Sequence, residues 1–233
     1  MKHNPKMLDK VFWGAYTRYA EGQDMTGAEK ARVEDVLRRL AEFGAKPPQS
    51  VFDAGCNNGA YTLALAMAGF DATGVDFAPG LLNAARRRAE ELKVPATFGK
   101  MDLDKVFWYA DGEFDNAICT SVLHAVRRPE WVLEELHRVI KPGGLLLVTT
   151  WLDEARHREA FPQLFAKPEN EPKAGLVTRL RQAVKTLSEP QRRAHYWTAE
   201  EMRHMLESRH FEILQMEGAP LLTIVARSEG DSY

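Results

Sequence analysis

Between residues 50 and 150, short apolar runs alternate with longer segments that carry apolar residues at helical spacing. Runs of this length are typical of strands that are buried on both faces of a parallel sheet. The helical segments at residues 81–92 and 132–140 would supply the crossovers that parallel strands need. The alternation therefore predicts an α/β fold with helices on both faces of the sheet. The apolar runs are residues 51–52, 72–75, 117–119 and 145–148.

The flanks of this core have a different pattern. Residues 1–48 are predicted to be helical, with a capping-box pattern from Thr26 to Glu29. Residues 151–197 contain nine Lys or Arg and six Asp or Glu, and we interpret them as a helical insertion. Residues 198–227 begin with a second capping-box pattern and continue as a helix and two β-rich runs. We expect a single domain in which these parts form an N-terminal cap, a lid and the edge of the sheet.

The composition of the chain limits the classes of function that it can have. The chain has 233 residues, with 31 Lys and Arg against 33 Asp and Glu, which gives a net charge of −2. This near-neutral charge lacks the basic footprint of a dedicated nucleic-acid binder and favours a small-molecule substrate. The two cysteines, Cys56 and Cys119, give no disulfide framework, and no apolar stretch is long enough for a membrane span. We expect a cytoplasmic protein without a membrane partner, either a monomer or a homodimer.

Residues 51–61 carry the strongest functional signal, because an apolar run passes into a turn of small residues and then into a helical pattern. Gly55 and Gly59 allow a ligand to approach the backbone, and the helix that follows points free N–H groups at it. The dinucleotide fingerprint fails here because positions 57 and 60 are Asn and Ala. A Gly-Lys-Ser/Thr sequence is also missing from the turn, which excludes a phosphate-binding P-loop.

The pattern Asp53-x-Gly55-x-Asn57-x-Gly59 resembles motif I of the class I S-adenosylmethionine (SAM) dependent methyltransferases. Asn57 stands where that family usually has glycine, and Asn is the residue that best tolerates a left-handed backbone after Gly. Asp53 is either a cofactor contact or an acid that orients the turn. Asp76 follows Gly55 by 21 positions, the length of one βαβ step, and its carboxylate would accept hydrogen bonds from ribose hydroxyls.

Three further segments extend the resemblance to residues 50–150. The resemblance implies that Asp76 binds the SAM ribose and that Phe77 lies against the adenine. Residues 101–103 (Met101, Asp102 and Leu103) resemble the adenine pocket, in which Asp102 competes with Asp104 for the adenine amino group. Residues 114–124 resemble the fourth strand and the loop after it, which place Thr120 beside the cofactor, and residues 136–144 resemble the passage into the fifth strand.

Candidates for the chemistry lie near the predicted acceptor side. His124, after the fourth strand, is either a general base or a polar plug beside the cofactor, with His195 and Tyr16 as reserve bases. Tyr16 and Tyr19 belong to an aromatic segment with Phe12 and Trp13, which is either a lid or a helix face packed on the sheet. Five residues bracket or lie in the insertion and either line an acceptor pocket or pack the lid: Trp151, His157, His195, Tyr196 and Trp197. We see no clustered metal-ligand pattern.

The resemblance implies a seven-stranded, mostly parallel sheet of order 3-2-1-4-5-7-6 with an antiparallel strand 7. SAM would lie across strands 1, 2 and 4, under a lid of residues 1–25 and 151–197. The expected reaction is methyl transfer to an O or N atom of a small molecule, which yields S-adenosylhomocysteine (SAH). Two alternatives remain open. Residues 55–61 and 122–151 are similar to tRNA wobble-uridine methyltransferases, and Asn57 in place of glycine suggests a non-catalytic SAM-binding module.

Overall fold

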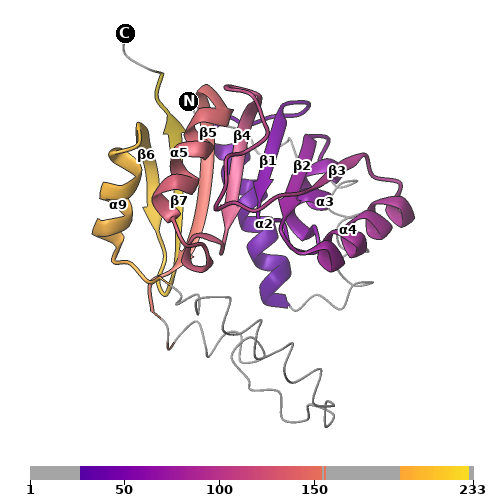
Figure 1. Cartoon of the computed structure of the whole chain (residues 1–233), viewed down its shortest axis with the longest axis horizontal. Coiled ribbons are helices and arrows are strands. Elements are labelled where there is room, and N and C mark those ends of the chain that lie inside the picture. Colours follow the sequence, from indigo (N-terminus) through magenta and orange to yellow (C-terminus); the bar gives the residue numbers. More distant parts are fainter. Residues whose placement is uncertain (1–26, 154, 156–194, 231–233) are drawn as a thin grey trace.

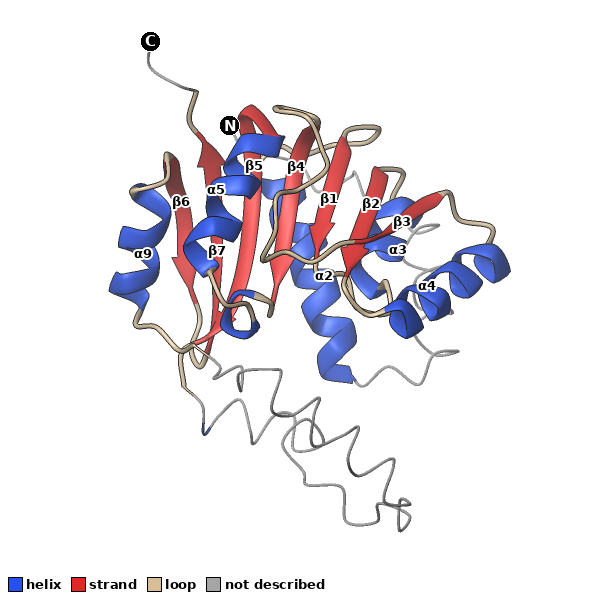
Figure 2. Ribbon diagram, in the orientation of Figure 1, coloured by secondary structure: helices blue, strands red, loops and turns tan. Residues whose placement is uncertain are grey.

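The protein folds around a seven-stranded sheet with helices on both faces (Figures 1 and 2). The computed structural model describes residues 27–153, 155 and 195–230. The expected helices in residues 1–25 and in the lid segment 156–194 therefore lie outside the described residues. The strands are β1 (Ser50–Ala54), β2 (Asp71–Asp76), β3 (Ala96–Lys100), β4 (Phe114–Thr120), β5 (Ile140–Trp151), β6 (Phe211–Glu217) and β7 (Leu221–Ser228).

The sheet order is β3-β2-β1-β4-β5-β7-β6, which confirms the predicted topology. The five strands from β3 to β5 run parallel, whereas β7 is antiparallel to both of its neighbours. Successive strands are added to one side of β1 as far as β3, and then to the other side from β4 onwards. A crevice forms at such a switch point, outside the carboxyl ends of the strands.

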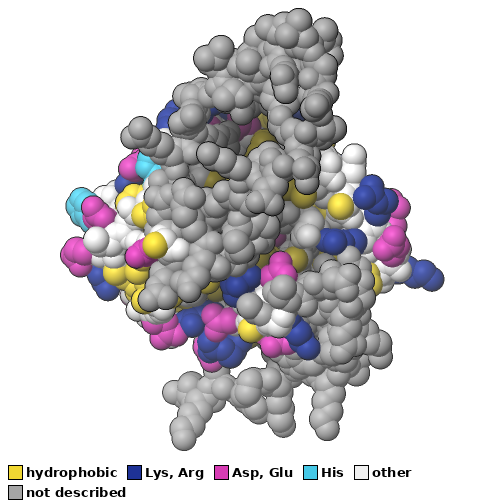
Figure 3. Space-filling view, turned by 90° about the horizontal axis from the view of Figure 1, so that it is seen from below, with side chains coloured by type: hydrophobic (Ala, Val, Ile, Leu, Met, Phe, Trp, Pro, Cys, Tyr) yellow, Lys and Arg dark blue, Asp and Glu magenta, His cyan; other side chains and the backbone are white. Residues whose placement is uncertain are grey.

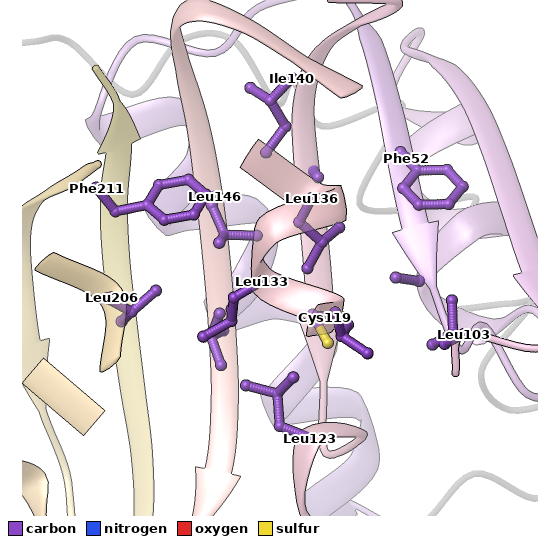
Figure 4. Close-up of a cluster of buried hydrophobic side chains, with 14 of the residues drawn as sticks. Phe52, Leu103, Cys119, Leu123, Leu133, Leu136, Ile140, Leu146, Leu206 and Phe211 are labelled. Atoms are coloured by element: carbon purple, nitrogen blue, oxygen red, sulfur yellow. The ribbon is translucent and has the colours of Figure 1, made fainter. Parts of the chain in front are cut away.

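Each face of the sheet has its own apolar core. The strand period of two sends Leu145 and Leu147 of β5 to one face and Leu146 and Val148 to the other. The first face packs against α2 (Gly27–Glu42), α3 (Ala60–Met67) and α4 (Pro79–Leu92), and the second against α5 (Pro129–Val139) and α9 (Ala199–Glu207). Figure 4 shows part of the second core.

Specific hydrogen bonds fix the start of α9 and the position of α2. The predicted capping box at Thr198 is confirmed, because the Thr198 hydroxyl accepts from Glu201 N and the Glu201 carboxylate accepts from Thr198 N. The buried Arg39 of α2 donates to Gln215 and Glu217 of β6, at 2.6 Å each. These bonds hold α2 against the distant edge of the sheet. The N-terminal turns of α2 then extend to the carboxyl ends of the central strands.

The connection from β3 to β4, residues 101–113, crosses the second face as a loop. Phe107 and Tyr109 of this loop pack on Phe52, with ring centroids 5.8 and 5.2 Å apart. The first residues of the loop remain at the carboxyl end of the sheet. Among the helices that the structure describes, none combines the length and apolar character needed to cross a membrane.

Candidate active site

A cavity of about 390 Å³ opens at the carboxyl ends of β1, β2 and β4. It is lined by the turn after β1, the residues that follow β2, β3 and β4, and one face of the start of α2. Figure 3 views the molecule from this end, where acidic and basic side chains are interspersed over the described surface. The cavity therefore gathers side chains from five separate segments of the chain.

The turn after β1 brings main chain into the cavity wall. Gly55 has a φ of +84°, and a Cβ built on it would lie 2.4 Å from Val122 Cγ2. A side chain at position 55 would therefore displace the loop after β4. Asn57 adopts the left-handed conformation with a φ of 53°, so the residue that replaces the expected glycine preserves the turn. Gly55 and Asn57 both line the cavity.

Gly59 and Asp53 lie behind this turn and do not line the cavity. A Cβ at Gly59 would lie 2.9 Å from both Ala85 Cβ and the Phe98 ring, so this glycine permits close packing. Asp53 is buried, and its Oδ2 accepts a 2.6 Å hydrogen bond from the Thr62 hydroxyl. Burial raises the pKa of Asp53 to about 7. The structure thus gives both residues a role in supporting the turn, and their cofactor contacts stay predictions.

Asp76 is held rigidly at the end of β2. One carboxylate oxygen accepts from Asn57 N and the other from Ala78 N, both at 2.9 Å. Each oxygen has a further lone pair, and Asp76 lines the cavity, so the carboxylate can accept from a ligand as well. Phe77 lies at the cavity wall and is 59% exposed. Both residues line the cavity, and their ribose and adenine contacts stay predictions.

The loop after β3 contributes Met101, Asp102 and Leu103 to the same wall. Asp104 also lines the cavity, but one of its carboxylate oxygens accepts from Arg127 N and Arg128 N at 2.8 and 3.2 Å. Asp104 therefore caps the entry into α5. Asp102 uses Oδ1 to accept from Asp104 N. Both acids line the cavity, and the assignment of Asp102 to the adenine amino group stays a prediction.

Beyond β4, the cavity wall consists of Thr120, Ser121, Val122 and His124. Ser121 has a φ of 55°, and its N–H donates to Thr149 O at 2.8 Å and to Thr149 Oγ1 at 3.0 Å. These bonds turn the loop into the cavity. The His124 side chain is 7% exposed and faces the Tyr196 ring at a centroid distance of 6.5 Å.

Of the two reserve bases, only His195 is among the described residues, and it does not line this wall. His195 is exposed, stacks on Trp197 at 5.6 Å, and reaches His124 only through its backbone N–H, which donates to His124 O. Tyr16 and Tyr19 lie outside the described residues. Among the predicted bases that the structure describes, His124 alone lines the cavity.

Sequence reasoning gave no site role to several cavity residues, among them Glu29, Arg32 and Tyr61. Tyr61 lines the cavity with Arg32 of α2 and Thr120 of β4, and both of these neighbours act to lower the pKa of its phenol. Burial raises the pKa of Tyr61 to about 12, against the opposing effect of the Arg32 charge, so the phenol is neutral at physiological pH. Glu29 and Arg32 are three positions apart, which puts both on one face of the helix. This spacing is the sequence pattern that could have identified them together.

The donor set fits a sulfonium nucleoside, with a carboxylate beside the sugar position, a second acid for an adenine amino group, and a backbone turn that a Cβ would fill. A doubly wound sheet with this site defines the class I, Rossmann-like methyltransferase architecture. Residues 52–148 match the family model described as a methyltransferase domain. Residues 52–148 are thus similar to a methyltransferase domain, and the cavity beside them has the donors and acceptors that a SAM cofactor would need.

Relatives and solved structures agree with this class. A ubiquinone biosynthesis O-methyltransferase of Pseudomonas aeruginosa (strain UCBPP-PA14) is 28% identical over 135 residues, which cover 58% of this chain and 56% of that protein. The PH0226 protein from Pyrococcus horikoshii OT3 has a TM-score of 0.64 at 21% identity, covering 88% of this chain and 92% of that one. A SAM dependent methyltransferase from Aquifex aeolicus has a TM-score of 0.58 at 21% identity, covering 84% and 89%. The chain spans about half the length of the curated relatives it matches.

Proposed function

We propose that the protein transfers the methyl group of SAM to an O or N atom of a small-molecule acceptor. The observation that carries this proposal is the lining of one cavity, which includes the Asp76 carboxylate at the end of β2 and the His124 imidazole after β4. The relatives named as O-methyltransferases favour oxygen as the acceptor atom. The near-neutral charge of the chain favours a small acceptor over a nucleic acid.

The roles of the residues follow from their places around the cavity. Asp76 would accept hydrogen bonds from the ribose hydroxyls, and Asp102 one from the adenine amino group. The turn at Gly55 and Asn57 would bring main chain close to the remaining part of the cofactor. SAM, when bound, supplies a methyl group that its positively charged sulfur already activates for displacement.

Most of the rate enhancement would come from geometry. Holding donor and acceptor in line while water is excluded can contribute up to about 7–11 kcal/mol. In the transfer, the acceptor oxygen forms the new bond to the methyl carbon, the carbon–sulfur bond breaks, and SAH leaves. For a hydroxyl acceptor, His124 would take the proton that the oxygen loses, which typically contributes about 10²–10⁴-fold.

The acceptor is tested by incubating the protein with methyl-tritiated SAM and separate fractions of small metabolites and of tRNA. We expect label in a small-molecule product, together with one equivalent of SAH. Label that is retained in tRNA, in a salt-sensitive manner, would contradict the small-molecule proposal. SAM binding without label transfer to either fraction would contradict catalysis and favour the binding-module alternative. Analytical ultracentrifugation of the protein at the assay concentration shows whether it is a monomer or a homodimer.

A further inference from the structure

The loop between β3 and β4 displays apolar side chains to solvent on its outward face. Val106 is 59% exposed and Trp108 79%, and Ala110 is exposed as well. The side chains between them, Phe107 and Tyr109, point the other way and pack on the sheet. This alternation gives the segment an inner and an outer face, as in a strand. The outer face is an apolar patch that lies outside the lining of the cavity.

Helix α5 holds this segment in place through its main chain. The buried Glu135 carboxylate accepts from Phe107 N at 2.6 Å. The Arg138 guanidinium donates to Phe107 O and to Tyr109 O, at 3.2 and 2.8 Å. The main chain behind the patch is therefore fixed from within the molecule. A partner that covers the patch would not have to order the loop first, which lowers the entropic cost of binding.

The two ends of the patch carry opposite charges. Lys105 precedes it and Asp111 follows it, both are exposed, and each is three positions from Trp108. The Asp111 carboxylate accepts from Arg138 at 2.7 Å, but its side chain is 83% exposed and accessible to a second cation. When two copies pack antiparallel about Trp108, Lys105 of each faces Asp111 of the other. A partner of one charge sign, such as an anionic membrane or a nucleic acid, would attract Lys105 and repel Asp111.

We propose that this face is a homodimer interface, with Trp108 of both copies at its centre and Lys105 paired with the partner's Asp111. Trp is enriched at the centre of interfaces, where it commonly carries a large share of the affinity. The patch is small beside an obligate interface, so the dimer forms reversibly and depends on protein concentration. The proposal is independent of the proposed function, because none of these three residues lines the cavity.

Sedimentation velocity of the full chain over about 1–100 μM measures the dimer directly. Trp108→Ala should weaken dimerisation about thirtyfold or more, which is the effect of losing a hot-spot residue. The matched control for a charge reversal is Arg87→Glu. Arg87 is an exposed residue of α4, which packs on the opposite face of the sheet. This control should leave the Kd of the dimer unchanged.

Two single charge reversals, Lys105→Glu and Asp111→Lys, test the pairing across the two-fold axis. Either variant alone brings like charges together at both ends of the patch, so each should dimerise at least about tenfold more weakly. In an equal mixture, the new acid of one variant faces the new lysine of the other, and the native Lys105 and Asp111 pair at the other end. The mixture should therefore regain the dimer, within about threefold of the wild-type Kd.

Three results would overturn the proposal. The first is a wild-type protein that stays monomeric over the whole concentration range. The second is a dimer that survives Trp108→Ala, because the interface would then lie elsewhere. The third is a mixture of the two reversal variants that remains monomeric, because Lys105 would then not face the partner's Asp111. Melting curves by circular dichroism should match wild type for every variant, since all the substituted side chains are exposed.

Discussion

Replacing Asp53 by asparagine isolates the effect of one buried acid on stability. Burial raises the pKa of Asp53 to about 7 in the folded protein, from an ordinary value of 3.8. The folded state therefore binds more protons than the unfolded state between these two values, and the free energy of unfolding falls as pH rises through that window. The asparagine of the variant cannot titrate, but its amide oxygen can still accept from the Thr62 hydroxyl. A shift of one pKa unit corresponds to about 1.36 kcal/mol. Between pH 5 and pH 8, the free energy of unfolding of the wild-type protein should therefore fall by about 3 kcal/mol relative to that of Asp53→Asn.

Urea unfolding of both proteins at pH 5, 6, 7 and 8 measures this difference, because other titrating groups contribute equally to both and cancel. Asp115→Asn is the matched control. Although burial opposes it, hydrogen bonds from Lys141 and Ser50 lower the pKa of Asp115, so its linkage to stability lies below pH 4. The difference between that control and wild type should be flat from pH 5 to pH 8. A flat difference for Asp53→Asn as well would refute the reasoning that the buried acid is neutral in the folded protein.

Three other substitutions test the cavity itself. Gly55→Ala places a methyl group 2.4 Å from Val122 Cγ2 in a left-handed turn, so we expect thermal unfolding at lower temperature and SAH binding at least about tenfold weaker; a normal Kd would contradict the tight turn. Asp76→Asn leaves one oxygen to serve two backbone donors and the ribose, and should weaken SAH about tenfold to a hundredfold by calorimetry, whereas an unchanged Kd would remove the ribose assignment. His124→Gln should lower kcat for a hydroxyl acceptor about 10²–10⁴-fold and leave the affinity for SAH unchanged. If kcat and the affinity for SAH fell by equal factors, His124 would only pack the cavity wall.

The sheet and the nucleoside side of the cavity were predictable because local patterns specify them. Short apolar runs separated by helical segments indicate parallel strands, and the acid one crossover after Gly55 indicates Asp76. The capping box at Thr198 depends on residues that are three positions apart, so the chain alone shows it. The structure confirms the strand order and the Thr198 cap, and it brings Gly55 and Asp76 into one cavity.

The remaining site residues could not be predicted because contacts between distant segments decide them. Arg32 lines the cavity near one end of α2, and Arg39, two turns further along the helix, donates to β6 residues about 180 positions later in the chain. The sequence also does not show that the Thr62 hydroxyl donates to the Asp53 carboxylate. Similarly, His124 and His195 are alike in type, and only the fold puts one in the cavity wall and the other at the surface.

A crystal structure of the protein soaked with SAH tests the central claim most directly. We predict density with the ribose hydroxyls at the Asp76 carboxylate and the thioether over Gly55. SAH at another place on the protein, or an empty cavity at a saturating concentration of SAH, would contradict the account.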